Sequence, residues 1–293
     1  MPELPEVETV RHGLAPHMTG RIIRDLTLNR PDLRFPFPQH FKDRLTGARI
    51  QQVSRRAKYL LIHVEDAGGD EAIWLSHLGM TGRFEIRPGG DGLAPALDAH
   101  FYAQAQSEAV AKHVHVQMEL DDGTHIHYAD PRRFGYMDLF PADTPYPAFV
   151  RMGPEPDAHL TFEDFYPRLT QRGLPIKSAL LNQEVIAGLG NIYVCEALFR
   201  AGISPRRKAN RLGPVRVARL IPAIQDVIAE AIAAGGSTLR DFRHSDGALG
   251  YFQHRFAVYD RAGAPCLQSD CTGIVQRIVQ SGRSTFFCPH CQR

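Results

Sequence analysis

Four cysteines near the C-terminus constrain this chain more than any other feature. They lie within the last 28 residues, with four, sixteen and two residues between neighbours: Cys266, Cys271, Cys288 and Cys291. Two cysteine pairs on tight turns, separated by enough chain for a β-hairpin, match the four-cysteine zinc-ribbon pattern. Four thiolates leave no position for a reactive water, so the pattern predicts one structural Zn²⁺ and not a catalytic one.

Length and composition limit the class of protein. A chain of 293 residues favours about two domains. A hydrophobic content of 43% and a charged content of 23% exclude a collagen-like or disordered chain. No apolar run approaches the roughly 20 residues of a membrane span. The opening MPELPEVETV carries acidic residues where a signal peptide is basic, so we expect a cytoplasmic protein with no membrane partner.

Basic residues concentrate in the C-terminal third. Residues 201–293 hold 13 Lys and Arg against 6 Asp and Glu, a net charge of +7, so the +2 of the whole chain leaves −5 for residues 1–200. A basic segment favours an anionic partner, and nucleic acid is the simplest one. A solvated charged face would give the same composition.

The hydrophobic pattern predicts an α+β protein whose strands come first. After a helix-like opening, short segments rich in β-branched and aromatic residues alternate with Gly, Pro and Asp up to residue 140, as in a β-sandwich or barrel. Residues 87–112 have no clear pattern and predict a long surface loop. Prolines crowd residues 141–157, which we expect to link two domains without helix or central strand.

Helical periodicity dominates residues 158–254, before the ribbon at 255–293. Apolar residues recur at three- and four-residue spacing in four segments that predict helices: 161–170, 175–188, 191–202 and 215–235. The turn 188–191 separates two of them. Its backbone N–H groups and the Asn191 side chain could contact a phosphate, although an ordinary junction between helices gives the same pattern.

The first residues carry a candidate nucleophile. Initiator Met is normally removed before a small residue, so the mature chain would begin with the secondary amine of Pro2. An α-amino group has a pKa of about 7.7–8.0, so more of it is unprotonated at neutral pH than of a lysine, and it can form an iminium ion. Glu3 and Glu6 could then move protons. The dipole of a helix also favours acids in its first turn, without any catalytic role.

Eight sequence blocks resemble those of the formamidopyrimidine-DNA glycosylases, in the same order along the chain. They are MPELPEVET, RRAKYLL at 55–61, HLGMTG at 77–82, DPRRFG at 130–135, GLGNIY at 188–193, GGSTLRDF at 235–242, SDGALGYFQ at 245–253 and the zinc ribbon. The resemblance covers essentially the whole chain. It implies a monomeric bacterial enzyme of the cytoplasm and nucleoid, with a catalytic β-sandwich domain at 1–140 and a helix-two-turn-helix DNA-binding domain at 158–254.

The resemblance also implies a base-excision-repair reaction. A DNA glycosylase of this family removes 8-oxoguanine and formamidopyrimidines from duplex DNA, and its AP lyase activity then cuts the strand. Pro2 would attack C1′ and form a Schiff base, with Glu3 as general acid/base and Glu6 supporting the site. Lys58 would donate the proton for β-elimination and contact phosphate, and Arg283 would serve δ-elimination and bind phosphate. The expected product is a one-nucleotide gap flanked by phosphates.

Further residues are assigned to DNA by the same resemblance. The damaged nucleotide must leave the stack, at a cost of a few kcal/mol, and the vacated space would be filled by Met80, Arg132 and Phe134. Arg132 would pair with the orphaned cytosine. Phosphates would be contacted by His113, Arg132, Asn191 and Arg283, and by Arg172 near the PIK segment. From the residues alone, HLGMTG and DPRRFG predict only turns.

Three alternatives stay open, and the chain departs from the family pattern twice. An endonuclease VIII-type glycosylase would prefer oxidised pyrimidines, and a zinc-ribbon nucleic-acid-binding protein would have no catalysis. A metalloenzyme could use histidine pairs whose i, i+2 spacing places each pair on one strand face: His113, His115, His125 and His127. The departures are the four-residue spacing of the first cysteine pair, where two is commoner, and the long loop before His113.

Overall fold

The computed structural model describes residues 2–87, 112–237 and 250–293. The expected surface loop lies outside these residues apart from its two ends, as do parts of the GGSTLRDF and SDGALGYFQ blocks. By contacts between residues, the described chain divides into two compact units. Unit 1 contains Pro2, the described part of 6–146, Ser237 and Gly250, and unit 2 contains residues 3–5, 147–236 and 251–293.

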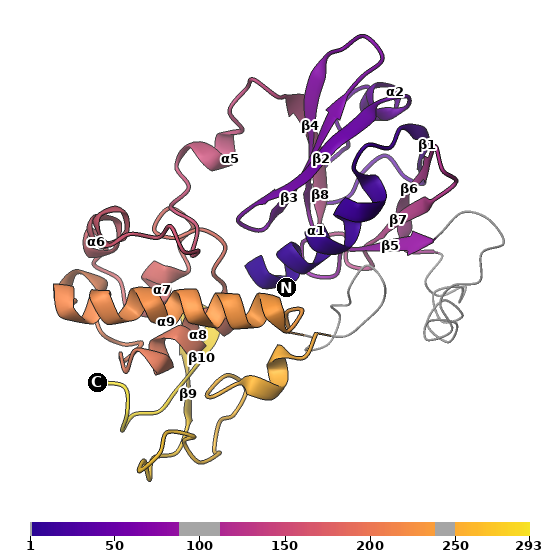
Figure 1. The fold of residues 1–293 in the computed structure, drawn as a ribbon. Coiled ribbons are helices and arrows are strands. Elements are labelled where there is room, and N and C mark those ends of the chain that lie inside the picture. The colour runs from indigo at the N-terminus through magenta and orange to yellow at the C-terminus, as the bar shows by residue number, and fades with distance from the viewer. Residues whose placement is uncertain (1, 88–111, 238–249) are drawn as a thin grey trace. The chain divides into compact units, whose positions relative to one another are not determined.

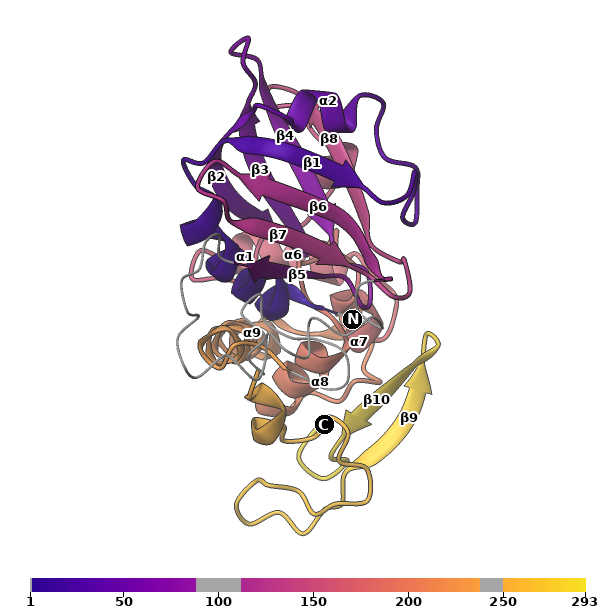
Figure 2. The same ribbon diagram turned by 90° about the vertical axis from the view of Figure 1, so that its right-hand side faces the viewer.

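Unit 1 is a β-sandwich, as the strand pattern predicted. One antiparallel sheet has the order β2-β3-β4-β8 and the other has the order β1-β6-β7-β5. Figure 2 shows the two sheets stacked, with the second sheet facing the viewer. Their strands are β1 (Ile23–Leu28), β2 (Arg49–Arg56), β3 (Tyr59–Glu65), β4 (Glu71–His77), β5 (Arg83–Arg87), β6 (Val114–Leu120), β7 (His125–Ala129) and β8 (Tyr136–Pro141).

Alternating burial along the strands explains the packing of unit 1. In β5, for example, Phe84 and Ile86 are buried while the residues between and beside them are half-exposed. Buried side chains from both sheets, including Trp74, form one apolar core. Two helices join it. Helix α1 (Leu4–Met18) contributes residues at helical spacing, and α2 (Phe41–Leu45) contributes its two ends. The leading helix is therefore confirmed.

The proline-rich segment contains one helical turn, which corrects the expectation of a linker without helix. Strand β8 ends at Pro141, and α5 (Pro147–Val150) follows. Pro147 occupies the first helical position, where proline is tolerated because that N–H has no partner within the helix.

Unit 2 is helical, but one expected helix is much shorter than its pattern suggested. The helices are α6 (Phe162–Thr170), α7 (Ile176–Leu180), α8 (Asn191–Arg200), η1 (Ala209–Arg211), α9 (Pro214–Ala233) and η2 (Phe252–Arg255). The helix predicted over 175–188 ends at Leu180. Beyond it, Asn182 Oδ1 accepts the Glu184 N–H at 2.9 Å and Gln183 Oε1 accepts the Gly188 N–H at 2.8 Å. Such local bonds compete with the helical ladder.

A β-hairpin near the C-terminus completes unit 2. Strands β9 (Gln276–Gln280) and β10 (Arg283–Phe287) pair antiparallel, drawn in yellow in Figure 1. Ser281 and Gly282 between them both have positive φ, 49° and 72°, as a type I′ turn requires.

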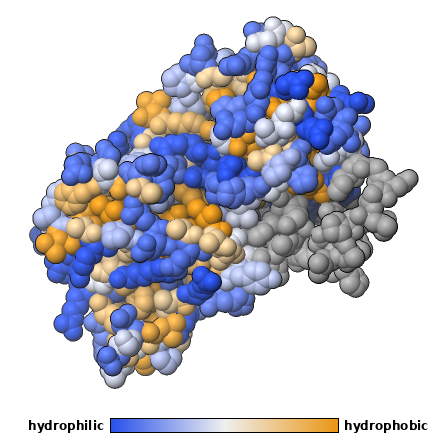
Figure 3. Space-filling view, viewed as in Figure 1, coloured by the Kyte–Doolittle hydropathy of each residue, from blue (hydrophilic) through white to orange (hydrophobic). Residues whose placement is uncertain are grey.

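Hydrophilic and hydrophobic residues alternate in small groups on the face drawn in Figure 3. Within the described part of the chain, no helix is long and apolar enough to cross a membrane.

Candidate active site and nucleic-acid interface

The first turn of α1 is tied down by a buried carboxylate. Pro2 is buried, and Glu6 is only 2% exposed. Glu6 Oε1 accepts the backbone N–H of Ser237 at 2.8 Å and the Ser237 hydroxyl at 3.0 Å. Within unit 1, these bonds fix the first turn of α1, the helix that follows the predicted nucleophile Pro2 in the chain. Glu6 therefore anchors the first turn of α1 to Ser237, and its supporting role in catalysis stays a prediction.

Lys58 is presented by a two-residue turn between β2 and β3. Ala57 has a φ of 52°, a left-handed conformation that L-residues rarely adopt. Arg55 stabilises this turn by donating from Nη1 to the Ala57 carbonyl at 2.9 Å, and its Nε donates to Glu8 of α1 at 2.8 Å. Although burial opposes ionisation of Glu8, hydrogen bonds from Arg11 and Arg55 lower the pKa of that carboxyl below its usual value. This pairing links α1 to the turn of Lys58, which is itself nearly buried.

His77 lies next to this turn and was missed as a site residue. It pairs with Tyr59 across strands β3 and β4, and its Nδ1 accepts the Gly79 N–H at 3.1 Å. Burial, together with the positive charges of Lys58 and Arg34, lowers the pKa of His77 to about 4. The imidazole is therefore neutral at neutral pH. Its position at the head of the HLGMTG block was the available signal.

Met80, Arg132 and Phe134 lie on two turns of unit 1. Met80 follows β4 and is half-buried, whereas Arg132 and Phe134 lie between β7 and β8. The Phe134 ring is 44% exposed, and the Arg132 guanidinium lies 4.9 Å from its centroid. An exposed apolar ring beside a cation suits insertion between bases. The two expected turns are confirmed.

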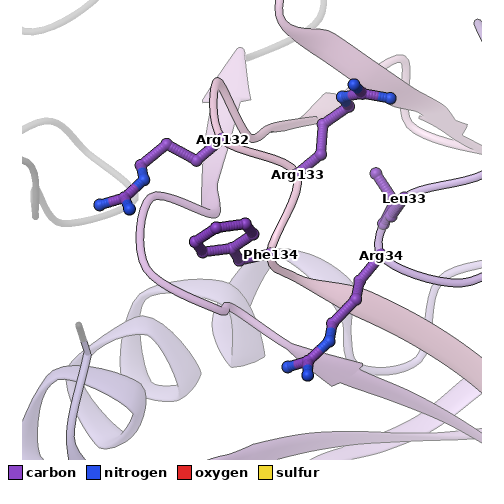
Figure 4. A pocket seen from close by; sticks show the side chains of 5 residues that line it. All are labelled: Leu33, Arg34, Arg132, Arg133 and Phe134. Atoms are coloured by element: carbon purple, nitrogen blue, oxygen red, sulfur yellow. The ribbon is translucent and has the colours of Figure 1, made fainter.

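Phe134 helps to line an open pocket of about 430 Å³, and Figure 4 shows all the side chains that line it: Leu33, Arg34, Arg132, Arg133 and Phe134. The Phe134 ring lies between the side chains of Arg132 and Arg34, and the three guanidinium groups point in different directions. In the part of the chain that the structure describes, neither Arg34 nor Arg132 pairs with a carboxylate. Arg34 and Arg133 add positive charge that sequence reasoning did not assign.

The four histidines of the metalloenzyme alternative do not form a group of potential metal ligands among the described residues. His113 precedes β6, and its carbonyl accepts the Asp130 N–H at 3.0 Å. His115 is buried, and its Nε2 lies 2.9 Å from the Asp130 carbonyl. Over residues 2–87, 112–237 and 250–293, the one group of potential metal ligands is the four cysteines. The structure therefore gives the metalloenzyme alternative no support.

Glu3 belongs to unit 2 and lies against the start of α8. It is 3% exposed, and its Oε1 accepts the Ile192 N–H at 3.1 Å. A Cβ on Gly190 would lie 2.2 Å from the Glu3 carboxyl carbon, so a side chain there would displace the Glu3 carboxylate. Leu4 adds a backbone bond to the Gly188 carbonyl at 3.2 Å. The turn 188–191 and the start of α8 therefore bind the carboxylate of Glu3 from the same chain. The sequence of the turn did not indicate this role.

Asn191 and Lys177 hold the hairpin that carries Arg283. Both side chains donate to the Ser284 carbonyl, Asn191 Nδ2 at 2.9 Å and Lys177 Nζ at 3.0 Å. Lys177 is fully buried, and burial together with the nearby charge of Arg283 lowers its pKa. Arg283 itself is exposed at the start of β10. The sequence alone did not single out Lys177, because its partner lies 107 residues away.

Arg172 is engaged within the protein. Its Nη2 donates to Glu184 Oε2 at 2.8 Å, and Glu184 also pairs with Arg151 at 2.9 Å. A phosphate contact by Arg172 would have to compete with this carboxylate, and it stays a prediction.

The four cysteines fit a tetrahedral metal ion. All four sulfurs lie within 4.8 Å of one another, and two Sγ–Sγ distances are 3.7 Å, Cys266 to Cys291 and Cys271 to Cys288. Ligands 2.3 Å from a tetrahedral Zn²⁺ lie about 3.8 Å apart, so this spacing suits zinc. Backbone N–H groups of Gln268 and Gly273 point at two of the sulfurs, as they do toward thiolates. The four-residue spacing of the first pair does not prevent the cluster from forming.

Comparisons with known proteins agree over the full length of the chain. Three family models match: the formamidopyrimidine-DNA glycosylase N-terminal domain at 1–137, the H2TH domain of the same enzymes at 152–243, and the zinc finger found in FPG and IleRS at 263–293. Formamidopyrimidine-DNA glycosylases of Ruegeria pomeroyi and Cereibacter sphaeroides are 52% and 50% identical, with 100% of each chain covered. The chain belongs to the formamidopyrimidine-DNA glycosylase family.

Solved structures of this family share the fold. A Lactococcus lactis FPG mutant in complex with Fapy-dG-containing DNA has a TM-score of 0.83 at 35% identity, and MutM in complex with DNA containing carbocyclic 8-oxo-G has 0.82 at 35%. Both comparisons cover 100% of each chain. The α+β class and the family resemblance are therefore confirmed. The matched zinc finger contains all four clustered cysteines, so they hold one structural zinc ion.

Proposed function

We propose that this chain is a bifunctional DNA glycosylase and AP lyase that excises oxidised purines from duplex DNA. Its substrates would be 8-oxoguanine and formamidopyrimidines. The relatives support this proposal by name, and similar structures were solved with DNA that contains Fapy-dG or an abasic site. The observation that carries the proposal is the position of Glu3. This residue directly follows Pro2 in the chain, and its buried carboxylate accepts the Ile192 N–H.

The N-terminal residues would carry the chemistry. After removal of Met1, the lone pair of the Pro2 nitrogen attacks C1′, the bond from C1′ to the base breaks, and the base leaves with a proton. Glu3 then gives a proton to O4′, the bond from C1′ to O4′ breaks so that the sugar ring opens, and the nitrogen lone pair forms an iminium ion with C1′. Lys58 then serves β-elimination and Arg283 δ-elimination. Glu6 supports the site through its bonds to Ser237.

The remaining predicted residues would hold the DNA. Met80, Arg132 and Phe134 fill the space of the flipped nucleotide, and the exposure of Phe134 supports this role. His113, Arg132, Asn191 and Arg283 contact phosphate, with Arg172 as a further candidate. Asn191 and Arg283 are close to one another through the hairpin. Asn191 Nδ2 donates to the carbonyl of Ser284, the residue that follows Arg283 in β10. Contacts of this kind position the duplex without specifying sequence.

We assign residues 1–140 to the catalytic domain, 141–157 to the linker, 158–254 to the helix-two-turn-helix domain and 255–293 to the zinc ribbon. The matched family models at 1–137, 152–243 and 263–293 support this division. Because the relatives are bacterial, we place the enzyme in the bacterial cytoplasm, at the nucleoid.

Borohydride trapping tests the proposal most directly. The full chain is incubated with a duplex that holds one 8-oxoguanine opposite cytosine, the imine is reduced, and the cross-linked peptide is mapped. We expect the adduct at Pro2, and an N-terminal tag that blocks Pro2 should abolish it. Preferential excision of thymine glycol opposite adenine would instead favour the endonuclease VIII-type alternative. Duplex binding without any adduct, with Met1 confirmed absent, would favour a binding protein without catalysis.

A further inference from the structure

The two turns that carry Met80, Arg132 and Phe134 are joined by buried polar groups. Thr81, which follows Met80, donates its hydroxyl to Asp130 Oδ1 and accepts the Arg132 N–H at 3.1 Å. Asp130 Oδ2 accepts the Gly135 N–H at 2.8 Å. Thr81 is 7% exposed and Asp130 is fully buried. The hydroxyl and the carboxylate therefore bridge the turn of Met80 to both ends of the Arg132–Gly135 segment.

The backbones of the two turns also touch directly. Gly79 has a φ of 61°, and a Cβ on it would lie 2.3 Å from the Gly135 nitrogen and from the Phe134 carbonyl carbon. No side chain separates the turns at this point. A shift of one turn would therefore displace the other.

Asp130 is in turn fixed to the sheet through its backbone. Its N–H donates to the His113 carbonyl at 3.0 Å, and its carbonyl lies 2.9 Å from His115 Nε2. The same carbonyl accepts the Arg133 N–H at 3.2 Å. Every polar group of Asp130 is thus engaged, and its carboxylate has a fixed place relative to β6. By contrast, among the described residues the Arg132 guanidinium forms no hydrogen bond or ion pair and lies over the Phe134 ring, so its direction depends on the backbone beneath it.

We propose that Thr81 and Asp130 are positioning residues that set the selectivity for the base opposite the lesion. This inference rests on the proposed function, in which Arg132 reads the orphaned cytosine. Donors that read a base edge must be held to within about 0.5 Å of their productive geometry. The Thr81 hydroxyl holds the Arg132 N–H, and Asp130 holds Thr81. When the hydroxyl is lost, Arg132 reaches cytosine and adenine more equally.

Thr81→Val tests the proposal, because valine keeps the shape of threonine and removes the hydroxyl. Single-turnover excision is measured on duplexes with 8-oxoguanine opposite cytosine and opposite adenine. We expect the cytosine-to-adenine ratio of rates to fall about tenfold, the scale of one well-placed base contact. Thr81→Ser keeps the hydroxyl and should leave the ratio of rates close to that of the unaltered protein. Combining Thr81→Val with Arg132→Ala should lower the ratio no further than Arg132→Ala alone.

Thr124→Val is the matched control. Thr124 is also 7% exposed, and its side chain also bonds an aspartate, Asp122, but it lies before β7 and away from both turns. It should leave the ratio unchanged. Asp130→Asn should lower the ratio as Thr81→Val does, while thermal unfolding monitored through Trp74 shows which variants remain folded.

Two results would overturn the inference alone. One is an unchanged ratio in a folded, active Thr81→Val protein. The other is a ratio that falls by the same factor whether or not Arg132 is present, because Thr81 would then act independently of Arg132. If the unaltered protein excises 8-oxoguanine from neither duplex, the proposed function fails, and this inference fails with it.

Discussion

The β-sandwich and the zinc ribbon are held together by different physical means. The sandwich buries large side chains such as Trp74 and Phe84 from two sheets in one apolar core. The apolar cluster next to the ribbon is small, and two of its members, Cys266 and Cys288, are zinc ligands. Most residues of β9 are exposed or half-exposed. The ribbon therefore depends on metal coordination, whereas the sandwich depends on burial, so the two regions should fail under different conditions.

Removal of zinc should give the largest difference between the two regions. Coordination supplies roughly 10 kcal/mol or more to structural zinc sites of this kind. We expect a chelator to unfold the ribbon, expose the amides of β9 and β10 to hydrogen exchange, and abolish DNA binding. Trp74 is the single tryptophan and lies in the sandwich core, so its fluorescence should not change. Full activity in a preparation shown to be free of zinc would contradict this expectation.

A buried carboxylate gives a second, smaller test of the ribbon. Glu196 of α8 accepts three backbone N–H groups from the first residues of the ribbon: Ala257 at 2.9 Å, Val258 at 3.0 Å and Tyr259 at 2.8 Å. Burial raises the pKa of Glu196, and these bonds oppose that shift. Glu196→Gln places an amide where only acceptors fit, so we expect a loss of about 1–3 kcal/mol in the free energy of unfolding of unit 2.

Hydrogen exchange of β9 and β10 and a denaturant titration would measure the effect of Glu196→Gln. The control is Glu230→Gln, which breaks a more exposed pair with Arg200 on the same unit and should cost about 0–1 kcal/mol. Equal losses in the two variants would show that Glu196 does not anchor the first residues of the ribbon.

The parts of the molecule that could be predicted from sequence are those whose chemistry is local. Four cysteines with this spacing bind one ion whatever the path of the chain between them. Each strand can be recognised by its own alternation of apolar and polar residues. The helix expected over 175–188 was wrong beyond Leu180, since Asn182 and Gln183 turn the chain with their side chains. Apolar spacing does not record such bonds.

Buried polar residues of the site were missed for a different reason. Lys177 bonds a carbonyl 107 residues later, and Thr81 bonds a carboxylate 49 residues later. Nothing near either residue in the sequence indicates its partner. The residue blocks shared with the family include His77 and Asp130, but they give no account of what these side chains hold. That information exists only in the folded chain.

Acid should weaken the sandwich through two of its histidines. Burial lowers the pKa of both His77 and His127 to about 4, with the charge of Lys58 adding to the effect at His77 and that of Arg87 at His127. In the unfolded chain both histidines titrate near 6.5. Between pH 6.5 and about 4 the unfolded state binds more protons, so the free energy of unfolding falls as pH falls. We expect the free energy of unfolding to fall by on the order of 1–3 kcal/mol per histidine. Unfolding can be monitored by the fluorescence of Trp74.

His127→Gln should remove about half of this pH dependence. Glu8 responds in a separate pH range. Because its pKa is lowered below the usual value of a glutamate, its contribution to stability is lost only as pH falls further, through the folded-state pKa. A sandwich whose stability stays constant from pH 6.5 to 4 would show that the two histidines are protonated in the folded protein.

The smallest expected effect concerns binding and not stability. Arg283 is exposed on the hairpin, so Arg283→Ala should leave unfolding of both regions unchanged. If its guanidinium contacts a phosphate, the slope of log binding constant against log salt should become shallower by about one unit. Arg219→Ala removes an equally exposed arginine from α9 and should not change the slope. An unchanged slope for Arg283→Ala would show that Arg283 does not contact a phosphate. Lys177 and Asn191 would then hold the hairpin in place for another of its residues.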